Sequence, residues 1–236
     1  MTGVAANQGD SNGLTELLDR FQKVRRQVAE SALAANREAA EVRVIAVTKG
    51  VPLDRVQAAS RLGIVDFGEN RVQEARGKVP CVEAATWHGI GRLQTNKVNW
   101  AVRLFPWIHS VDREDLVRQL SRAAGQFGCR PQVLVEVLTG DAATKGGVVP
   151  QRLPWLLEVV AESEHLNLAG LMTVASRDHP QHDFAQLRML REQWIGRFPS
   201  LLELSMGMSD DFPLAIEEGA TMIRIGRALF GARPAI

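Results

Sequence analysis

The chain has 236 residues, of which 45% are hydrophobic and 23% charged, a composition typical of a globular protein with a sizeable core. Its 28 basic and 27 acidic side chains nearly cancel, and the formal charge of +1 argues against nucleic acid or an anionic membrane as the main partner. Two cysteines, Cys81 and Cys129, are too few for a disulfide framework, and no apolar run approaches the ~18 residues of a membrane span.

Residues 1–13 are small and polar, with neither the basic start nor the apolar core of a signal peptide. They predict a disordered tail on a cytoplasmic protein. From Leu14 to about Ala40, apolar side chains recur at helical spacing with charges between them, which predicts an amphipathic helix. No linker or low-complexity stretch interrupts residues 14–236, so this part of the chain is expected to form one domain.

After that helix, short apolar runs typical of buried strands alternate with helical segments. The expected strands are residues 42–48, 64–67, 86–88, 108–110, 132–138, 168–173, 202–205 and 222–225. The expected helices cover the stretch after Pro52, residues 71–78, the stretch from about Gln94, residues 113–125, the stretch after Pro154, and residues 183–197, 211–218 and 227–231. Alternating units of this kind imply a parallel sheet. Eight of them near the roughly 250-residue size of such folds predict an α/β protein, a (β/α)8 TIM-type barrel with an extra N-terminal helix.

The working face of such a barrel lies at the carboxyl ends of its strands. Lys49 follows the first expected strand, so the sequence places it at the barrel mouth. A lysine after a strand is most often a solvated charge. The alternative is a Schiff-base nucleophile, which needs the pKa of about 10.4 lowered by ~3 units through burial and nearby cations such as Arg224.

The loops after the seventh and eighth strands commonly form the phosphate site of these barrels. Here they contain Gly207, Ser209 and Gly226, and a short helical stretch follows at residues 227–231. Glycines let backbone N–H groups approach a phosphate, and helix N-termini favour anions. The alternative is that these glycines only make tight turns.

Two further side chains have two interpretations each. Arg224 either pairs with an acid or faces a pyridine nitrogen, where it would disfavour ring protonation and weaken a cofactor as an electron sink. His88 is either a packed strand-end histidine or a group flanking a ring. The five histidines show no metal-ligand pattern, so no metal site is expected.

Six segments, spaced in one order along the chain, carry a resemblance to a known family. They are VIAVTKGVP (44–52), FGENRVQEA (67–75), WHGIGRLQTNK (87–97), HSVDR (109–113), GLMTV (170–174) and LSMGMSDDFPLAIEEGATMIRIGRALFG (204–231). With them the chain resembles the pyridoxal phosphate homeostasis protein family, related to the N-terminal barrel of alanine racemase. The resemblance covers the chain from about residue 14.

The resemblance implies a fold-type III barrel that holds pyridoxal 5'-phosphate (PLP) as a Schiff base on Lys49. It implies phosphate contacts at Ser209, Gly226 and Arg227, with Arg224 at the pyridine nitrogen. Four further residues would lie near the cofactor: Asn70, His88, Met206 and Gly207.

The chain also departs from the family pattern. A second Lys-Pro common after the cofactor lysine is Val51-Pro52, a common tyrosine is Arg71, and an aromatic residue after the histidine is Gly89. Arg227 stands where threonine or serine is usual, which puts one hydroxyl contact to the phosphate in doubt.

The family resemblance implies intracellular PLP homeostasis: binding and storing the cofactor and delivering it to PLP-dependent apoenzymes, as a monomer without an established reaction. The rival is an amino-acid racemase of the alanine racemase type. Two-base racemisation of that type needs a tyrosine from a second domain, whereas this chain has no tyrosine and ends at Ile236, just after the barrel. A Schiff-base aldolase without a cofactor explains neither Arg224 nor the paired phosphate loops as well, and a scaffold without enzymatic activity is the remaining alternative.

Overall fold

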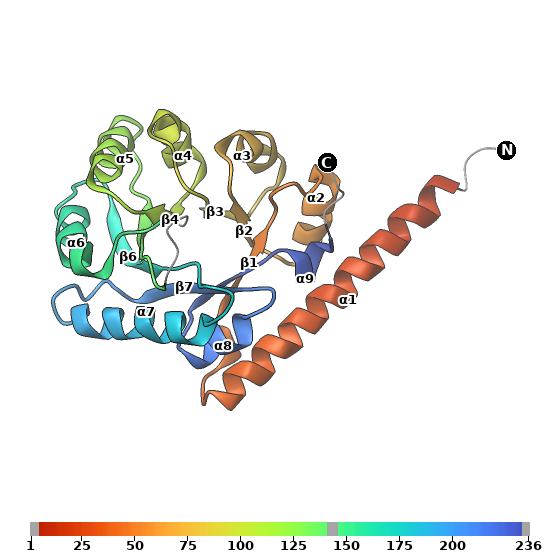
Figure 1. Cartoon of the computed structure of the whole chain (residues 1–236). Coiled ribbons are helices and arrows are strands. Elements are labelled where there is room, and N and C mark those ends of the chain that lie inside the picture. Colours follow the sequence, from red (N-terminus) through yellow and green to blue (C-terminus); the bar gives the residue numbers. More distant parts are fainter. Residues whose placement is uncertain (1–4, 141–145, 233–236) are drawn as a thin grey trace.

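Within residues 5–140 and 146–232, which the computed structural model describes, eight parallel strands alternate with helices (Figure 1). The strands are β1 (Arg43–Val47), β2 (Asp66–Glu69), β3 (Thr86–Gly89), β4 (Trp107–Val111), β5 (Gln132–Glu136), β6 (Asn167–Met172), β7 (Glu203–Met208) and β8 (Met222–Ile225). The helices are α1 (Ala5–Ala34), α2 (Leu53–Arg61), α3 (Val72–Lys78), α4 (Val98–Leu104), α5 (Glu114–Gln126), α6 (Leu153–Ala161), α7 (Pro180–Trp194), α8 (Phe212–Glu217) and α9 (Arg227–Phe230). Four 3-10 turns lie at Ala39–Glu41, Val79–Cys81, Thr95–Lys97 and Pro150–Arg152.

The strands close into a barrel in sequence order. Each strand pairs in parallel with the next, and β8 pairs with β1, where Ile45 lies opposite Arg224. Both faces of a barrel strand are covered, so these strands are continuous apolar runs rather than alternating ones. The predicted (β/α)8 fold is confirmed, with an N-terminal helix outside the barrel.

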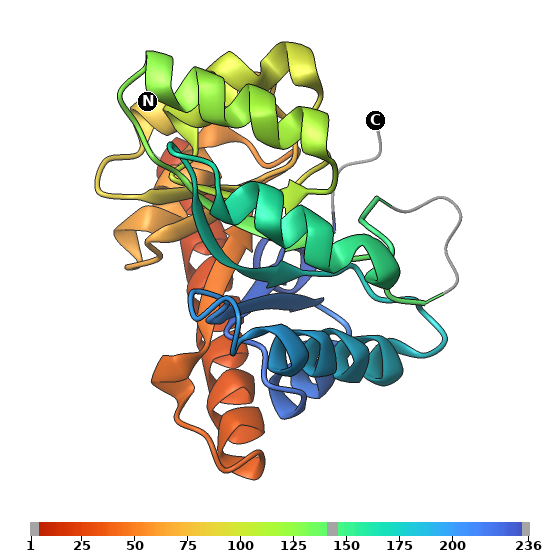
Figure 2. The same cartoon turned by 90° about the vertical axis from the view of Figure 1, so that its left-hand side faces the viewer.

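The main hydrophobic core lies between the barrel and the surrounding helices (Figure 2). Helix α5 shows how the sequence forms this layer, because Leu116, Leu120 and Ala123 recur at helical spacing and are all buried. On the strand side, Phe67 of β2 and Trp87 of β3 stack with their ring centroids 5.3 Å apart. Because side chains alternate along a strand, the residues directly before and after Phe67 and Trp87 point into the barrel.

Helix α1 lies outside the barrel and packs against α8 and α9 (Figure 1). Leu17, Val24 and Val28 form its buried face. The helix ends at Ala34, earlier than the expected end near Ala40. Just beyond its last residue, Asn36 adopts a left-handed φ of 55°. It begins at Ala5, although the apolar periodicity starts only at Leu14. Residues 1–4 of the expected tail lie outside the described residues, and the division of the chain at residue 14 stays a prediction.

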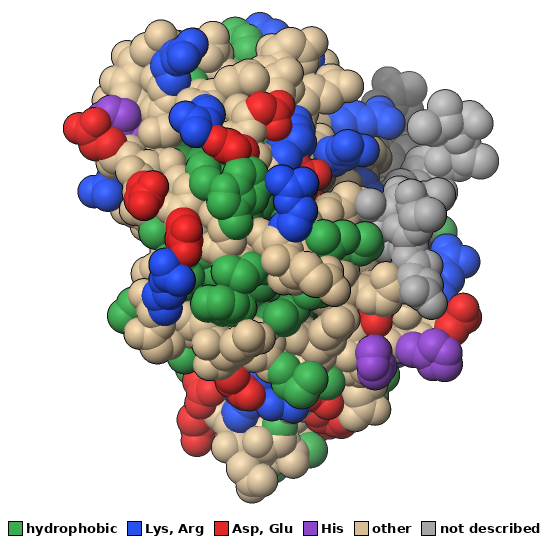
Figure 3. Space-filling view, turned by 60° about the vertical axis from the view of Figure 1, so that its left-hand side comes forward, with side chains coloured by type: hydrophobic (Ala, Val, Ile, Leu, Met, Phe, Trp, Pro, Cys, Tyr) green, Lys and Arg blue, Asp and Glu red, His purple; other side chains and the backbone are tan. Residues whose placement is uncertain are grey.

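Charges of both signs are interspersed over the face of the molecule shown in Figure 3. Large exposed hydrophobic side chains such as Leu33, Met189 and Leu202 lie on separate elements. No helix in the described part of the chain is long and apolar enough to cross a bilayer.

Candidate functional site

The residues predicted to do the chemistry gather at one end of the barrel. Lys49 follows β1, Asn70 follows β2, Ser209 follows β7 and Gly226 follows β8. These four strands are consecutive around the closed barrel, in the order β7, β8, β1 and β2. Their carboxyl ends therefore form one continuous part of the barrel mouth.

Lys49 lies in a tight turn directly after β1. The residue before it, Thr48, is fully buried, whereas Lys49 itself is half-buried. Gly50 closes the turn with a φ of +69°, a conformation that favours glycine. The lysine is thus attached to a constrained backbone at the edge of the barrel interior.

Arg224 points into the barrel from β8 and is anchored there by three acceptors. Its Nη1 donates to the carbonyl oxygen and to the hydroxyl of Ser205, both at 2.8 Å, and its Nη2 donates to the carbonyl oxygen of Thr173 at 2.7 Å. Burial lowers the pKa of the guanidinium to about 10, although the nearby Glu136 and Asp211 carboxyl groups act in the opposite direction. Arg224 is therefore a cation with a defined orientation at neutral pH.

A chain of hydrogen bonds runs from Arg224 across the barrel interior. Ser205 Oγ lies 2.9 Å from His109 Nδ1, His109 Nε2 lies 3.0 Å from His88 Nδ1, and His88 Nε2 lies 2.9 Å from Asp66 Oδ1. Because a guanidinium only donates and the Asp66 carboxylate only accepts, the direction is fixed at both ends: the Ser205 hydroxyl accepts from Arg224 and donates its one proton to His109. His109 then donates through Nε2 to His88, and His88 donates through Nε2 to the Asp66 carboxylate.

Both histidines of this chain are buried and neutral. Burial lowers the pKa of His88, against the raising effect of the Asp66 carboxylate. Burial, together with His88 and Arg224, holds the pKa of His109 well below its usual range. A neutral imidazole has one donor and one acceptor nitrogen, so each ring satisfies its two contacts without a second proton.

Two predicted site residues lie differently from the expectation. Both ring nitrogens of His88 have protein partners in the barrel interior, so the packed interpretation describes its position and it contacts Arg224 only through His109 and Ser205. Met206 is fully buried in the main core outside the barrel. The physical reason is the alternation of a strand, since Ser205 points inward and its neighbour Met206 points outward.

In this same part of the mouth, the loops after β7 and β8 meet. Ser209 Oγ accepts a hydrogen bond from the backbone N–H of Ala228 at 3.2 Å. A Cβ added to Gly226 would lie in ordinary van der Waals contact with Val47, at 3.6 Å or more, so this position accepts a Cβ without a clash. Gly207 has a φ of +88°, and a Cβ there would come within 2.6 Å of the Ala215 Cβ, so its glycine is required by packing against α8. The Arg227 guanidinium is ion-paired with Asp210.

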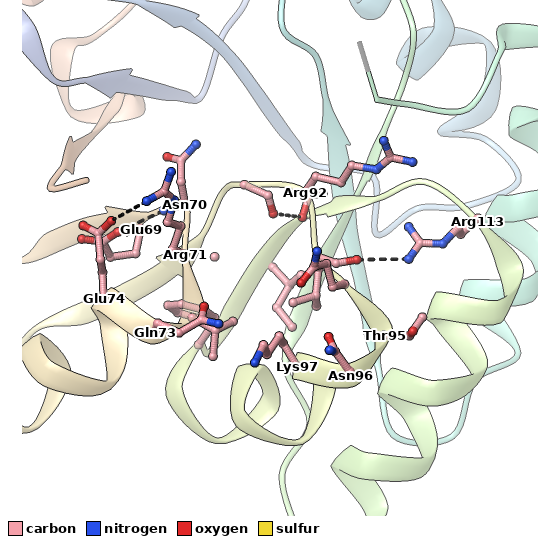
Figure 4. Close-up of a pocket in the computed structure, with 18 residues that line it drawn as sticks. Glu69, Asn70, Arg71, Gln73, Glu74, Arg92, Thr95, Asn96, Lys97 and Arg113 are labelled. Atoms are coloured by element: carbon pink, nitrogen blue, oxygen red, sulfur yellow. Dashed lines mark hydrogen bonds and ion pairs between the residues drawn. The ribbon is translucent and has the colours of Figure 1, made fainter. Parts of the chain in front are cut away.

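A cavity of about 1140 Å³ lies beside this mouth, between the loops that follow β2 and β3 (Figure 4). Asn70 is the predicted site residue on its wall, which Arg71, Arg92 and Lys97 make basic. Lys49, Ser209 and Arg224 do not line it. This cavity therefore adjoins the predicted site and shares Asn70 with it.

The residues that support Arg224 were not predicted from the sequence. Ser205 and Thr173 contact it, Glu136 acts on its charge, and His109 contacts Ser205, yet none was a candidate. The signal was present in polar residues within apolar strands, such as Glu136 at the end of β5. Among the described residues, no group of three His, Cys, Asp or Glu side chains is arranged to hold a metal ion.

Glu136 makes the stability of the ligand-free protein depend on pH. Burial and the nearby Asp112 raise its pKa to about 7, although Arg224 and Arg92 act to lower it. The unfolded chain releases this proton near pH 4.5, so stability is present below that pH and is lost as pH rises toward 7, by about 3 kcal/mol in all. The buried histidines, whose pKa values are lowered, change stability in the opposite direction.

We expect Glu136→Gln to remove this dependence. The difference in urea-unfolding free energy between variant and wild type should grow in favour of the variant from pH 5 to pH 8. Comparing the two proteins at each pH cancels the contribution of the histidines. A constant difference across this range would show that Glu136 does not titrate there.

Comparison with known proteins agrees with this geometry. Residues 18–234 match the family described as alanine racemase, N-terminal domain. The fold and the site thus define a barrel protein of the alanine racemase N-terminal class. The alanine racemase of Clostridium difficile has this fold, with a TM-score of 0.76 at 12% identity over 94% of this chain and 58% of that one.

Closer relatives specify the family, and the chain belongs to the pyridoxal phosphate homeostasis proteins. It is 41% identical to the protein of that name from Pseudomonas aeruginosa in an alignment of 230 positions that covers 93% of this chain and 97% of that protein. It is 37% identical to the Aquifex aeolicus protein in an alignment of 222 positions that covers 91% of this chain and 97% of that one. The structure of PipY from Synechococcus elongatus, solved with PLP bound, has a TM-score of 0.80 at 37% identity and covers 91% of this chain and 100% of that one.

Proposed function

We propose that this chain binds PLP as a Schiff base on Lys49 and serves intracellular PLP homeostasis, without catalysing a reaction of its own. The observation that carries the proposal is the pairing of β1 with β8, which brings the half-buried Lys49 and the anchored Arg224 to one barrel mouth. The relatives named above carry the homeostasis name, and PipY was solved with PLP bound.

The residues present fit the cofactor. PLP supplies an aldehyde for a lysine amine and a phosphate that needs an anchor. Lys49 provides the amine, and the turn after β8, whose Ala228 N–H contacts Ser209 Oγ and which contains Gly226, suits the phosphate. The backbone of Arg227 belongs to the same turn, while its side chain pairs with Asp210. Asn70 borders the mouth after β2.

Arg224 is the residue that favours a carrier over a racemase. It holds a positive charge against three fixed acceptors, and a cation at the ring nitrogen disfavours the protonation that makes PLP an electron sink. His88 contacts His109, Met206 packs in the main core and Gly207 packs against α8, so we expect them to support the site indirectly, without side-chain contact to the cofactor. Deuterium exchange at Cα of alanine or serine in the loaded protein tests the racemase alternative, and its absence is expected.

The setting that we propose for this activity is the cytoplasm, with a monomer that passes PLP to apoenzymes that depend on it. Two observations argue against nucleic acid or a membrane surface as the partner instead. The net charge is only +1, and charges of both signs are interspersed on the face in Figure 3, which does not suit nucleic acid or a membrane surface. Light scattering of the loaded protein measures the oligomeric state.

One experiment tests the cofactor and its attachment together. The absorption spectrum of the purified protein is recorded with PLP before and after borohydride reduction, and the reduced protein is mapped by peptide mass. A yellow band that reduction removes, leaving a pyridoxyl group on Lys49, is the expected result. A protein that stays colourless with added PLP refutes the proposal.

Substitutions in the two loops test the phosphate anchor. We expect Gly226→Asp to weaken PLP retention roughly a hundredfold, because it sets a carboxylate against the phosphate dianion in a partly buried site. Gly226→Ala is the matched control, since the space accepts a Cβ without a clash. Ser209→Ala removes one hydroxyl and should weaken retention about fivefold. Retention is measured by dialysis followed by the absorption spectrum, and unchanged retention in Gly226→Asp would mean that the phosphate lies elsewhere.

A further inference from the structure

We propose that Lys78, together with Glu69 and Glu74, is a positioning residue that holds the Lys49 turn and Asn70 in place for the cofactor. This inference rests on the proposed function. Lys78 lies at the end of α3, its side chain is 10% exposed, and that of Glu69 is fully buried. The three side chains form one ionic cluster beside the turn after β1, and the side chain of Glu74, at 28% exposure, is its most exposed member.

The cluster holds the backbone on both sides of Lys49. Lys78 Nζ donates to the carbonyl oxygen of Thr48, the residue before it, at 2.7 Å. The amide N–H of Gly50, the residue after it, donates to Glu74 Oε2 at 2.8 Å. The Thr48 hydroxyl also donates to Glu69 Oε1 at 2.7 Å. Because the backbone is hydrogen-bonded on both sides of Lys49, only the side-chain rotamers of this lysine are left to vary.

The same cluster reaches Asn70. Glu69 Oε1 accepts from Lys78 Nζ at 2.6 Å, while its other oxygen, Oε2, accepts from the backbone N–H of Asn70 at 3.1 Å. Figure 4 shows Glu69 and Glu74 close together beside Asn70. The turn after β1 and the loop after β2 therefore share one ionic anchor.

Donor counting shows that Lys78 is fully used in this role. An ammonium group has three protons, and Lys78 Nζ has three acceptors: Thr48 O, Glu69 Oε1 and Glu74 Oε2, the last at 3.3 Å. Glu74 and Lys78 are four residues apart on α3, so they project from one face of the helix. The position of α3 against the barrel thereby sets the position of the Lys49 turn.

If Lys78 had a purely structural role, its loss would lower the stability of the protein and change nothing else. The variants therefore distinguish an effect on the position of the Lys49 turn from an effect on stability. Lys78→Met leaves Glu69 as a buried charge without its cation and is expected to be unstable. Lys78→Met combined with Glu69→Gln removes one charge of each sign and keeps similar side-chain volumes. Arg188→Met is the control, because it removes a cation paired with Glu192 and Glu218 far from the mouth.

Two measurements follow the anchor directly. In the ligand-free double variant, the amide protons of Gly50 and Asn70 should exchange with solvent about five- to tenfold faster than in wild type, as expected for weakened hydrogen bonds. In the loaded protein, release of PLP from Lys49 should be about ten- to a hundredfold faster, because small displacements of a reacting group have large effects. Arg188→Met should change neither quantity.

The inference is overturned if the folded double variant exchanges the amide protons of Gly50 and Asn70, and releases PLP, at the wild-type rates. Equal effects in Arg188→Met would overturn it as well, since they would reflect general loosening. If the wild-type protein takes up no PLP, the proposed function fails by itself, and amide exchange in the ligand-free protein still decides whether Lys78 holds the turn.

Discussion

Lys49→Ala abolishes covalent attachment of PLP while leaving the barrel folded. The expected result follows from position, because Lys49 is half-buried in a turn outside the strand ladder, and such substitutions change stability by about 1 kcal/mol or less. The variant should lack the yellow band and yield no pyridoxyl peptide after borohydride reduction. Residual PLP held through the phosphate would be lost on dialysis, since the carbon–nitrogen bond is absent.

Lys97→Ala is the matched control for this prediction. Lys97 lines the cavity beside the mouth, and an amine there reacts with an aldehyde in solution if access alone decides attachment. The control should keep the wild-type spectrum and the adduct on Lys49. Loss of the adduct in Lys97→Ala, with an unchanged spectrum in Lys49→Ala, would move the attachment point to the neighbouring cavity.

The order of elements could be predicted because each strand carries its own local signal. Buried β-branched runs such as residues 42–48 and 132–138 contain the strands Arg43–Val47 and Gln132–Glu136. The second strand is displaced, however, to Asp66–Glu69 from the expected residues 64–67. Its pairing with β3 extends through Gly68 and Glu69. Because the β propensity of glycine is poor, the carboxyl end of this strand is determined by pairing with β3 and not by local sequence.

Site residues at strand ends could be predicted for the same reason, because a strand end is visible in the sequence and the barrel mouth follows from the fold. Lys49, Asn70, Ser209 and Gly226 all lie where that argument placed them. Met206 lies within β7, and the sequence did not show the direction of its side chain. The inward direction of Ser205, observed in its bond to His109, determines that of Met206.

The interior hydrogen-bond chain was beyond reach of local patterns. Its links join residues 22, 21, 96 and 19 positions apart, from Asp66 through His88, His109 and Ser205 to Arg224. Only barrel closure brings these side chains together, since all five point to the common axis from different strands. The Lys78 cluster is similar, because it depends on how α3 is seated behind β1 and β2.

Arg224→Leu should destabilise the ligand-free protein by about 3 kcal/mol, because the lost hydrogen bonds outweigh the relief of a buried charge. Removing the guanidinium ends its desolvation, which is the cause of its lowered pKa. It also leaves the carbonyl oxygen of Thr173 without this donor, at about 1–3 kcal/mol for an acceptor left unsatisfied, and it deprives Glu136 of a neighbouring cation, whereas the carbonyl oxygen of Ser205 keeps the N–H of Thr173. Urea unfolding at pH 7 measures the loss, and Arg152→Leu, an exposed arginine 4.9 Å from the Trp155 ring, should lose less than about 1 kcal/mol.

The same variant tests the direction of the interior chain, and a stability measurement alone does not. Because the Asp66 carboxylate only accepts, a neutral His88 donates to it through Nε2 and accepts at Nδ1, so the ring nitrogen shifts of His109 should report a proton on Nε2 and none on Nδ1. With leucine at position 224, Asp66 still sets this direction, and His109 should keep the same tautomer; a change of tautomer would mean that Arg224 sets it instead. A wild-type His109 protonated on Nδ1 would contradict this direction, because His88 would then donate to His109 and turn an unprotonated Nε2 toward the Asp66 carboxylate.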